Sequence, residues 1–155
     1  MHYIILFMAK DAIIVVGLIA AIYWLTLPKK DKIRFVIFGI IAGLVGLVLV
    51  KVGGAMFYDT RPFVSHNLIP IYPSAADNGF PSDHTALATV IAVTVYVISK
   101  RLGLVFFGVA LAIGLARVLG NIHSPIDILG SVIFAVLAGA VAYYLTPKLM
   151  EKLKI

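Results

Sequence analysis

The stretch Phe35–Val50, with the sequence FVIFGIIAGLVGLVLV, carries no charged or hydrogen-bonding side chain. A helix of that length extends for about 24 Å, close to the roughly 30 Å hydrocarbon core of a bilayer. Further uncharged stretches occur at Ala12–Leu27, Thr85–Ser99, Leu102–Ala116 and Ile128–Leu145, the last closed by Pro147. Nothing in them alternates with period two, and backbone groups in lipid must be paired, so helices are expected rather than a barrel. We predict an all-α, polytopic transmembrane helix bundle with five spans, extended by flanking residues.

The composition supports a membrane protein. Of the 155 residues, 62% are hydrophobic and only 13% are charged, and the mean hydropathy is +1.08. A chain this small cannot bury so much apolar surface in a water-soluble fold, so a soluble enzyme and a disordered chain are both excluded. The absence of cysteine excludes thiol catalysis, disulfides and thiolate metal sites. We expect one membrane-embedded domain over residues 1–155, whose net charge of +6 concerns topology and anionic ligands rather than nucleic acid.

The first apolar stretch has an ambiguous beginning, because Lys10 and Asp11 interrupt it. Residues 3–27 could form one tilted helix, or an interfacial segment could precede a shorter span. We favour the second interpretation, with the charged pair as a boundary at the interface. A cleaved signal peptide is not expected, because no basic residue precedes the apolar run.

Small residues at helical spacing indicate where helices pack closely. Gly39 and Gly43 form one such pair, and Ala138 and Ala142 form another. Side chains this small let helix backbones approach one another, so both pairs are interpreted as packing contacts.

The basic residues are distributed unevenly between the predicted connections. Nine of the thirteen lie in connections on one side, namely Lys29, Lys30, Lys32, Arg34, Lys100, Arg101, Lys148, Lys152 and Lys154. The positive-inside rule makes that side cytoplasmic. The long loop Asp59–Pro81 and the turn 117–127 then lie at the extracytoplasmic face of the plasma membrane. A loop this long in a compact membrane protein is typical of a functional segment.

Unusual polar residues gather at three places: the end of the second predicted helix, the start of the third, and the turn before the fifth. Because helix direction alternates with each crossing, these three places meet on one face. The candidate residues that they bring together are Lys51, Arg61, Ser82, Asp83, His84, Arg117, His123 and Asp127. Ionisable residues at such positions are functional candidates by default.

Part of this set is suited to binding a tetrahedral oxyanion. Arg61 and Arg117 are fixed cations with forked donors. Ser82, just after Pro81, can cap the third helix, whose first backbone N–H groups offer an anion site. Asp83 has two equal interpretations, as that helix's N-cap or as a partner near His84.

The remaining polar residues are suited to nucleophilic and acid–base chemistry. Ser124-Pro125-Ile126-Asp127 has the pattern of positions N-cap to N3 of the fifth helix. Asp127 can reach back to the imidazole of His123, fix its tautomer and make the other ring nitrogen a better nucleophile. His84 offers a second imidazole as general acid. The sequence therefore predicts a phosphate-binding pocket that holds a nucleophile and a proton donor.

These residues resemble the motifs of the type 2 phosphatidic acid phosphatases, membrane lipid phosphatases related to acid phosphatases and vanadate haloperoxidases. That family has a lysine followed six residues later by Arg-Pro, then Pro-Ser-Gly-His, then Ser-Arg, five residues, His, three residues and Asp. Matching segments occur in order at Arg61-Pro62, at Pro81-Ser82-Asp83-His84 and at Arg117, His123 and Asp127. Ala116 replaces the serine of the third motif.

Two departures from the family pattern stand out. Asp83 stands where the family usually has glycine. The resulting motif Pro-Ser-Asp-His is similar to that of the bacitracin-resistance branch, the undecaprenyl-diphosphatases. Gly54 occupies the position of the family lysine, and Lys51 lies about one helical turn earlier. The family commonly has six spans, one more than the five counted here.

The resemblance implies a mechanism. His123 attacks the terminal phosphorus and forms a phosphohistidine, Asp127 orients His123, and His84 protonates the leaving oxygen and then activates water. The phosphoryl oxygens are held by Arg61, Arg117, Ser82 and Lys51. The substrate implied is undecaprenyl diphosphate, whose hydrolysis supports cell-wall precursor recycling. No metal or other cofactor is expected, because two histidines and scattered aspartates lack a closed ligand set.

Other interpretations remain open at this point. A broader lipid phosphatase acting on phosphatidic acid, phosphatidylglycerophosphate or diacylglycerol diphosphate would use the same motifs, and a lipid or phosphate transporter could use the same cations without reacting. A structural subunit ranks last, because it leaves the charges without purpose. Asp59 and Asp77 are interpreted as solvated loop carboxylates, and Tyr72 as an interfacial aromatic. The partners expected are the lipid substrate and membrane lipids, and the sequence does not give the oligomeric state.

Overall fold

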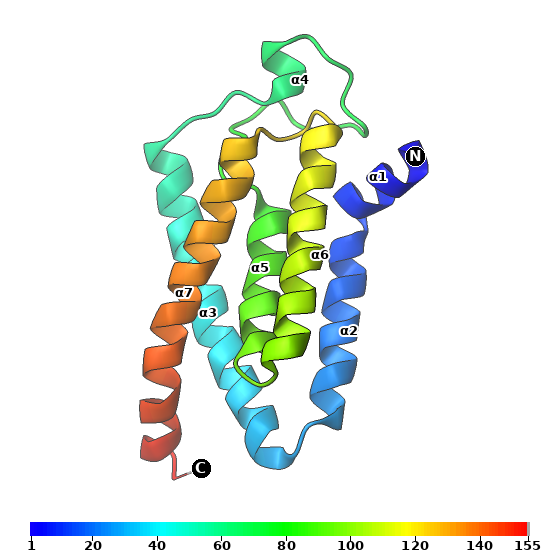
Figure 1. Ribbon diagram of the computed structural model, residues 1–155. Helices are drawn as coiled ribbons and strands as arrows, with labels where there is room; N and C mark the ends of the chain where they lie inside the picture. Colours follow the sequence, from blue (N-terminus) through cyan, green and yellow to red (C-terminus); the bar gives the residue numbers. More distant parts are fainter. Residues whose placement is uncertain (155) are drawn as a thin grey trace.

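The computed structural model describes residues 1–154 as a bundle of helices (Figure 1). In chain order these are α1 (His2–Lys10), α2 (Ala12–Thr26), α3 (Lys29–Met56), α4 (Pro62–Ser65), α5 (Asp83–Tyr96), α6 (Lys100–Leu119) and α7 (Pro125–Lys152). Residues 1–154 contain no β-strand, and their only β-type pairing is an isolated bridge between Thr60 and Asn78. The all-α prediction is therefore confirmed.

Three helices, α3, α6 and α7, are long and apolar enough to cross a membrane. A fourth span results if α1 and α2 are counted together. The predicted number of five is not confirmed, because α5 has only 14 residues and extends for about 21 Å, which is short of the bilayer core. The described chain is a membrane protein with three to four helices of spanning length.

The break between α1 and α2 lies where the charged pair predicted a boundary. The two helices are bent by 58° relative to each other. Asp11 is the residue between them, and Lys10 is exposed. One straight helix over residues 3–27 is therefore ruled out in favour of a short N-terminal helix followed by a longer one.

Helix α5 is the centre of the bundle, with α2, α3, α6 and α7 around it (Figure 1). One core cluster joins it to α2 and α6, where Ala88 and Ala92 lie against Ile113. A second cluster joins it to α3 and α7 through Val90, Phe38 and Ala135. The many alanines let the surrounding helices approach closely. Because other helices surround α5 on several sides, most of its side chains are buried.

The outer surface of the bundle is apolar. Large side chains that are more than half exposed include Leu18, Ile40, Leu44, Leu104, Leu115 and Leu137, which are distributed over α2, α3, α6 and α7. Water would not stabilise so extensive an apolar surface, whereas lipid does. The surface therefore agrees with the spans in indicating a membrane protein.

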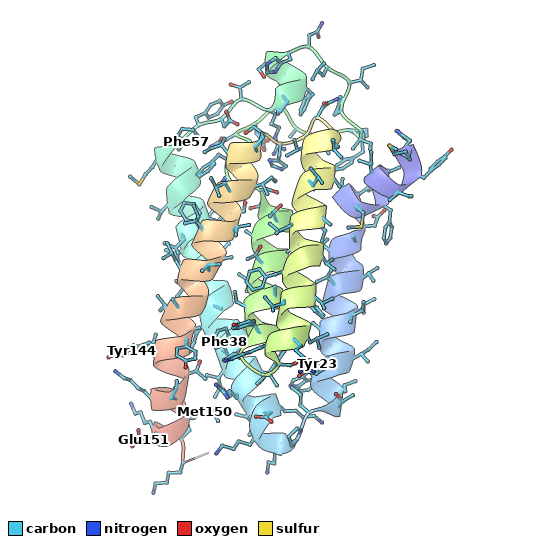
Figure 2. The ribbon with its side chains drawn as sticks, viewed as in Figure 1. Tyr23, Phe38, Phe57, Tyr144, Met150 and Glu151 are labelled. Atoms are coloured by element: carbon cyan, nitrogen blue, oxygen red, sulfur yellow. The ribbon has the colours of Figure 1, made fainter. Side chains whose placement is uncertain are left out.

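The two ends of the bundle differ in character. At one end lie α4 and the loops around it, together with the turn from α6 to α7 (top of Figure 1). Phe57 lies near this end, whereas Tyr144, Met150 and Glu151 lie near the opposite one (Figure 2). Helix α7 continues through Pro147 to Lys152, beyond the predicted closure at that proline. The connections α2–α3 and α5–α6 lie at the same end as the C-terminus, so the nine cations predicted to share one side do so.

Candidate active site

A polar cavity of about 390 Å³ lies at the loop end of the bundle. The predicted residues that line it are Lys51, Arg61, Asp83, His84, Arg117 and His123. They come from α3, from the loop before α4, from the start of α5, from the end of α6 and from the turn before α7. Segments separated by up to 72 positions thus meet in one place, as the alternation of helix direction predicted.

His123 lies in the turn between α6 and α7 and is 2% exposed. Its Nδ1 is 3.1 Å from Oδ2 of Asp127, which is fully buried one turn into α7. The same carboxylate oxygen accepts the backbone N–H of Ser124 at 2.9 Å, so Asp127 takes part in the predicted capping box. Asp127 therefore caps α7 and orients the imidazole.

The hydrogen bonds around His123 determine its tautomer. Nε2 is 3.0 Å from a terminal nitrogen of Arg117 and 3.5 Å from one of Arg61. Guanidinium groups only donate, so Nε2 must be the acceptor and Nδ1–H must donate to Asp127. The lone pair of Nε2 therefore points toward both arginines.

Burial lowers the pKa of His123 below its ordinary value of 6.5. The hydrogen bond to Asp127 opposes this effect, and the positive charges of Arg117 and Arg61 add to it. A lowered pKa favours the neutral form of His123 at neutral pH.

Arg117 is buried near the end of α6 and held on several sides. One terminal nitrogen donates to the carbonyl of Ala9 at 2.7 Å and to the hydroxyl of Tyr72 at 2.9 Å, and the other reaches His123. Its Nε has no partner among residues 1–154. The interpretation of Tyr72 as an interfacial aromatic was incomplete, since its hydroxyl also accepts a hydrogen bond from this guanidinium.

Arg61 is the residue just before the short helix α4 and has a largely covered side chain. Its Nε donates to Asp77 at 2.8 Å, and a terminal nitrogen donates to the carbonyl of Ile122 at 3.3 Å. Asp77 is therefore an ion-pair partner, and the interpretation of it as a solvated loop carboxylate was incomplete. Asp59, interpreted in the same way, accepts a hydrogen bond from the hydroxyl of Ser124.

Ser82 stands at the predicted N-cap position of α5 but does not line the cavity, whereas Asp83 lines the cavity and is not the N-cap. Ser82 is the N-cap residue of α5, but its fully buried hydroxyl pairs with that of Thr85 at 3.1 Å and does not line the cavity. Asp83 is the first residue of α5 rather than its cap, and its side chain is exposed at the cavity. His84 follows, half-buried, and lines the same cavity as His123.

Lys51 lies on α3 and lines the cavity from the side of the membrane interior. Gly54, at the position of the family lysine, lies beneath the loop that precedes α5. A Cβ there would lie 3.0 Å from the carbonyl oxygen of Phe80. The close approach of this loop explains the glycine, and it leaves Lys51 as the cation that α3 contributes.

Asn78 and Gly79 support the site and were not singled out from the sequence. The side chain of Asn78 accepts the N–H groups of Asp59 and Phe80 and donates to the carbonyls of Gly54 and Phe57, all at 2.9 Å. A Cβ on Gly79 would lie 2.9 Å from Oδ2 of Asp127. The Asn78-Gly79 pair thus ties the loop to α3 and lets its backbone approach the carboxylate of Asp127. The dipeptide's preference for turns was the available signal.

Among residues 1–154, no three histidine, aspartate or glutamate side chains are grouped to hold a metal ion. The positive charge at the cavity comes from Arg61, Arg117 and Lys51. Such an arrangement can bind a tetrahedral oxyanion and present a neutral imidazole to it.

Comparison with known proteins identifies the family of this chain. The family model described as PAP2 superfamily matches residues 32–151. The undecaprenyl-diphosphatase BcrC of Bacillus subtilis (strain 168) is 34% identical over 138 residues, which cover 88% of this chain and 70% of that protein. The bacitracin transport permease protein BcrC of Bacillus licheniformis is 29% identical over 147 residues, which cover 94% of this chain and 72% of that protein. No solved structure matches the chain.

Proposed function

This chain belongs to the PAP2 superfamily, and from that premise we propose that it is a membrane phosphatase that hydrolyses a polyprenyl diphosphate to the monophosphate and inorganic phosphate. The substrate in a bacterium would be undecaprenyl diphosphate, the compound in the name of the Bacillus subtilis relative. The family resemblance seen in the motifs is confirmed. The chain would act as one membrane-embedded domain.

One observation carries the mechanism: the Nε2 lone pair of His123 faces two guanidinium groups while Nδ1–H is held by a buried carboxylate. A phosphoryl group that enters between them would take over the hydrogen bonds that Arg117 and Arg61 now give to Nε2. This exchange would leave the lone pair unblocked and directed at phosphorus. Charge on the phosphoryl oxygens would then be stabilised by donors that are already in position.

The reaction has two steps. In the first, Nε2 of His123 forms a bond to the terminal phosphorus, the bond from phosphorus to the bridging oxygen breaks, and His84 protonates that oxygen. In the second, His84 takes a proton from water, the hydroxide attacks phosphorus, and the N–P bond breaks to release phosphate. The carboxylate of Asp127 stabilises the positive charge that His123 carries in between. Both imidazoles line one cavity, which supports this division of roles.

Anion binding is assigned mainly to the two arginines, with a further contribution from Lys51 on α3. Arg117 has an unpartnered buried Nε, as seen within residues 1–154, which supports a contact with a phosphoryl oxygen. Ser82 lies behind the cavity wall, where its carbonyl accepts a hydrogen bond from Ser131 at 2.9 Å. We therefore propose that Ser82 acts on phosphate by holding the start of α5 in place.

An apolar cavity that adjoins the polar one supports a lipid substrate. It is lined by residues of α3, α5 and α7 and has a volume of about 390 Å³. Gly43, expected to pack against a neighbouring helix, instead lines this cavity, and a Cβ on it would meet no atom within 4 Å. We propose that the first isoprenoid units of the substrate lie here. The uneven distribution of cations supports an active site on the extracytoplasmic face of the plasma membrane.

A phosphate-release panel tests the proposal. The purified protein in detergent is expected to release phosphate from undecaprenyl diphosphate faster than from phosphatidic acid or phosphatidylglycerophosphate. A faster release from the glycerophospholipids would favour the broader lipid phosphatase.

The transporter alternative is favoured by one observation, the transport name of the Bacillus licheniformis relative. The variants His123→Ala and His84→Ala separate the two functions, because a transporter needs neither a nucleophile nor an acid. Loss of phosphate release in both variants is expected for the phosphatase. Phosphate release that survives both changes would remove the catalytic interpretation.

A further inference from the structure

We propose that Lys51 binds the tail-proximal phosphate of the substrate and thereby makes the site selective for diphosphates over monoesters; this inference rests on the proposed function. The terminal phosphate lies among His123 and the two arginines in that function. A diphosphate carries a second phosphate between the reacting one and the lipid tail. The residue that contacts this second phosphate decides whether a diphosphate is favoured.

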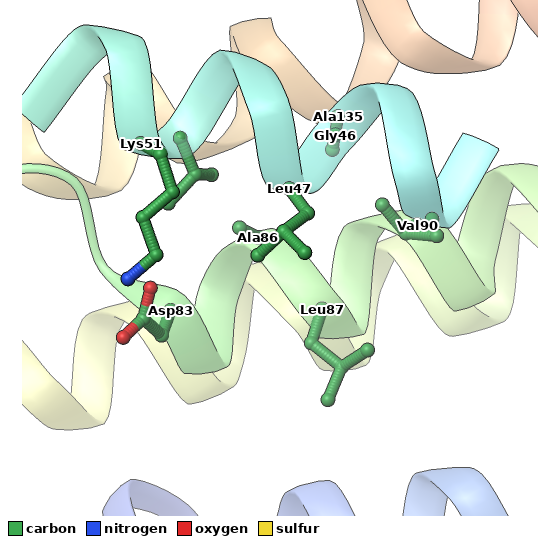
Figure 3. A pocket seen from close by; sticks show the side chains of 10 residues that line it. Gly46, Leu47, Lys51, Asp83, Ala86, Leu87, Val90 and Ala135 are labelled. Carbon is green, nitrogen blue, oxygen red and sulfur yellow. The ribbon is translucent and has the colours of Figure 1, made fainter.

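Lys51 lies where the polar and apolar cavities meet. It lines both of them, together with Val50 and Asp83. Toward the membrane interior the apolar cavity continues past Gly46, Leu47, Ala86 and Val90 (Figure 3). Consider a substrate with its terminal phosphate at His123 and its tail in the apolar cavity. Its second phosphate, which joins these two parts, would lie beside Lys51.

The departure from the family motif explains why this cation is displaced toward the tail. A lysine at position 54 would start beside the loop of Asn78 and Phe80, but Gly54 packs under that loop. Lys51 begins three residues earlier, about 4.5 Å along the axis of α3 in the direction of the apolar cavity. The cation on α3 therefore lies farther from the reacting phosphate, and nearer to the tail-proximal phosphate, than a lysine at position 54 would.

The surroundings of Lys51 leave its charge available. No side chain among residues 1–154 forms a hydrogen bond or an ion pair with it. Its ammonium group extends toward the side chain of Asp83 across the opening (Figure 3). The two groups do not form an ion pair, so a phosphate that binds Lys51 would not have to displace Asp83 from it. A flexible ammonium group is well suited to a phosphate at this position.

Matched farnesyl compounds test the inference, because farnesyl diphosphate and farnesyl monophosphate share one tail and differ by one phosphate. In Lys51→Met, we expect kcat/KM for the diphosphate to fall about 10- to 100-fold. This is the effect expected when one charge-assisted hydrogen bond to the substrate is lost. The inhibition constant of the monophosphate should change less than about threefold, because it occupies the arginine end. Lys51→Arg should recover most of the diphosphate activity. Lys100→Met, at the opposite end of the bundle, is the matched control and should behave as wild type.

Equal losses with both compounds, or no loss with either, would overturn the role of Lys51. Binding of farnesyl methylenediphosphonate, which cannot be hydrolysed, is measured in parallel. Its affinity should fall in Lys51→Met and not in Lys100→Met, and an unchanged affinity would also overturn the inference. The wild-type protein could bind this analogue in a Lys51-dependent way and yet release no phosphate from farnesyl diphosphate. That result would contradict the proposed function and leave the inference supported. The two failures are therefore distinguishable.

Discussion

Replacing Asp127 by asparagine separates the charge of this residue from its shape. Oδ2 accepts from Nδ1–H of His123 at 3.1 Å and from the N–H of Ser124 at 2.9 Å, and an amide oxygen can accept both. A hydrogen bond to a charged group contributes about 1.5–3 kcal/mol and a neutral one about 0.5–1.5 kcal/mol. The difference grows when His123 becomes positively charged in the transition state, so about 1.4–2.8 kcal/mol of stabilisation is lost. At about 1.4 kcal/mol per tenfold change, kcat should fall about 10- to 100-fold.

The assay is phosphate release from a polyprenyl diphosphate at saturating substrate, with thermal unfolding measured on the same samples. Asp77→Asn is the matched control, because Asp77 is 65% exposed and pairs with Arg61 at the edge of the site. An exposed ion pair contributes at most about 1 kcal/mol, so this control should lose less than about fivefold. A folded Asp127→Asn protein with kcat within twofold of wild type would refute the assigned role of the carboxylate.

Three further predictions follow from the same geometry. Burial lowers the pKa of His123 and attack requires its neutral form, so the acid limb of the pH profile of kcat/KM should lie below pH 6.5. Asp127→Asn should move this limb to lower pH, because the carboxylate raises the pKa of the imidazole. An acid limb above pH 6.5 would argue against His123 as the nucleophile. Gly43→Leu should raise KM about 5- to 10-fold for long prenyl diphosphates, because the leucine side chain fills apolar space beside the tail. The KM for dimethylallyl diphosphate, whose tail is short, should not change. Gly108→Leu, at a position with equally open surroundings on the exposed face of α6, is the control, and identical KM values in the two variants would refute the tail position. Vanadate should inhibit as an analogue of the trigonal transition state and a chelator should not, so strong loss of activity with chelator would contradict the metal-free mechanism.

Part of the site could be predicted because it depends on local spacing. His123 and Asp127 are four residues apart across a helix start, so the capping pattern alone brings the carboxylate to the ring. The meeting of Arg61, His84 and Arg117 follows from the alternation of helix direction. These inferences needed no knowledge of loop conformation.

The remaining contacts depend on how the long loop folds, which its sequence does not reveal. Asn78 makes four hydrogen bonds, and three of them join it to groups 19 to 24 positions away, which have no characteristic spacing. The contact of Tyr72 with Arg117 is of the same kind. The apolar run at 85–99 indicated a span, but its hydropathy could not distinguish a helix surrounded by protein from one that faces lipid. The helix that forms there, α5, has only 14 residues, and its short length accounts for the difference between the five predicted spans and the three to four helices of spanning length.

The most direct test of the mechanism is to trap the phosphorylated enzyme. The purified protein is mixed with undecaprenyl diphosphate labelled in its terminal phosphate, quenched within a turnover, and digested for mass spectrometry. The mechanism predicts an acid-labile, alkali-stable phosphate on the peptide that contains His123, absent from His123→Ala and accumulated when the hydrolysis step is slowed. Label on any other residue, or wild-type turnover with no covalent label at any quench time, would contradict it.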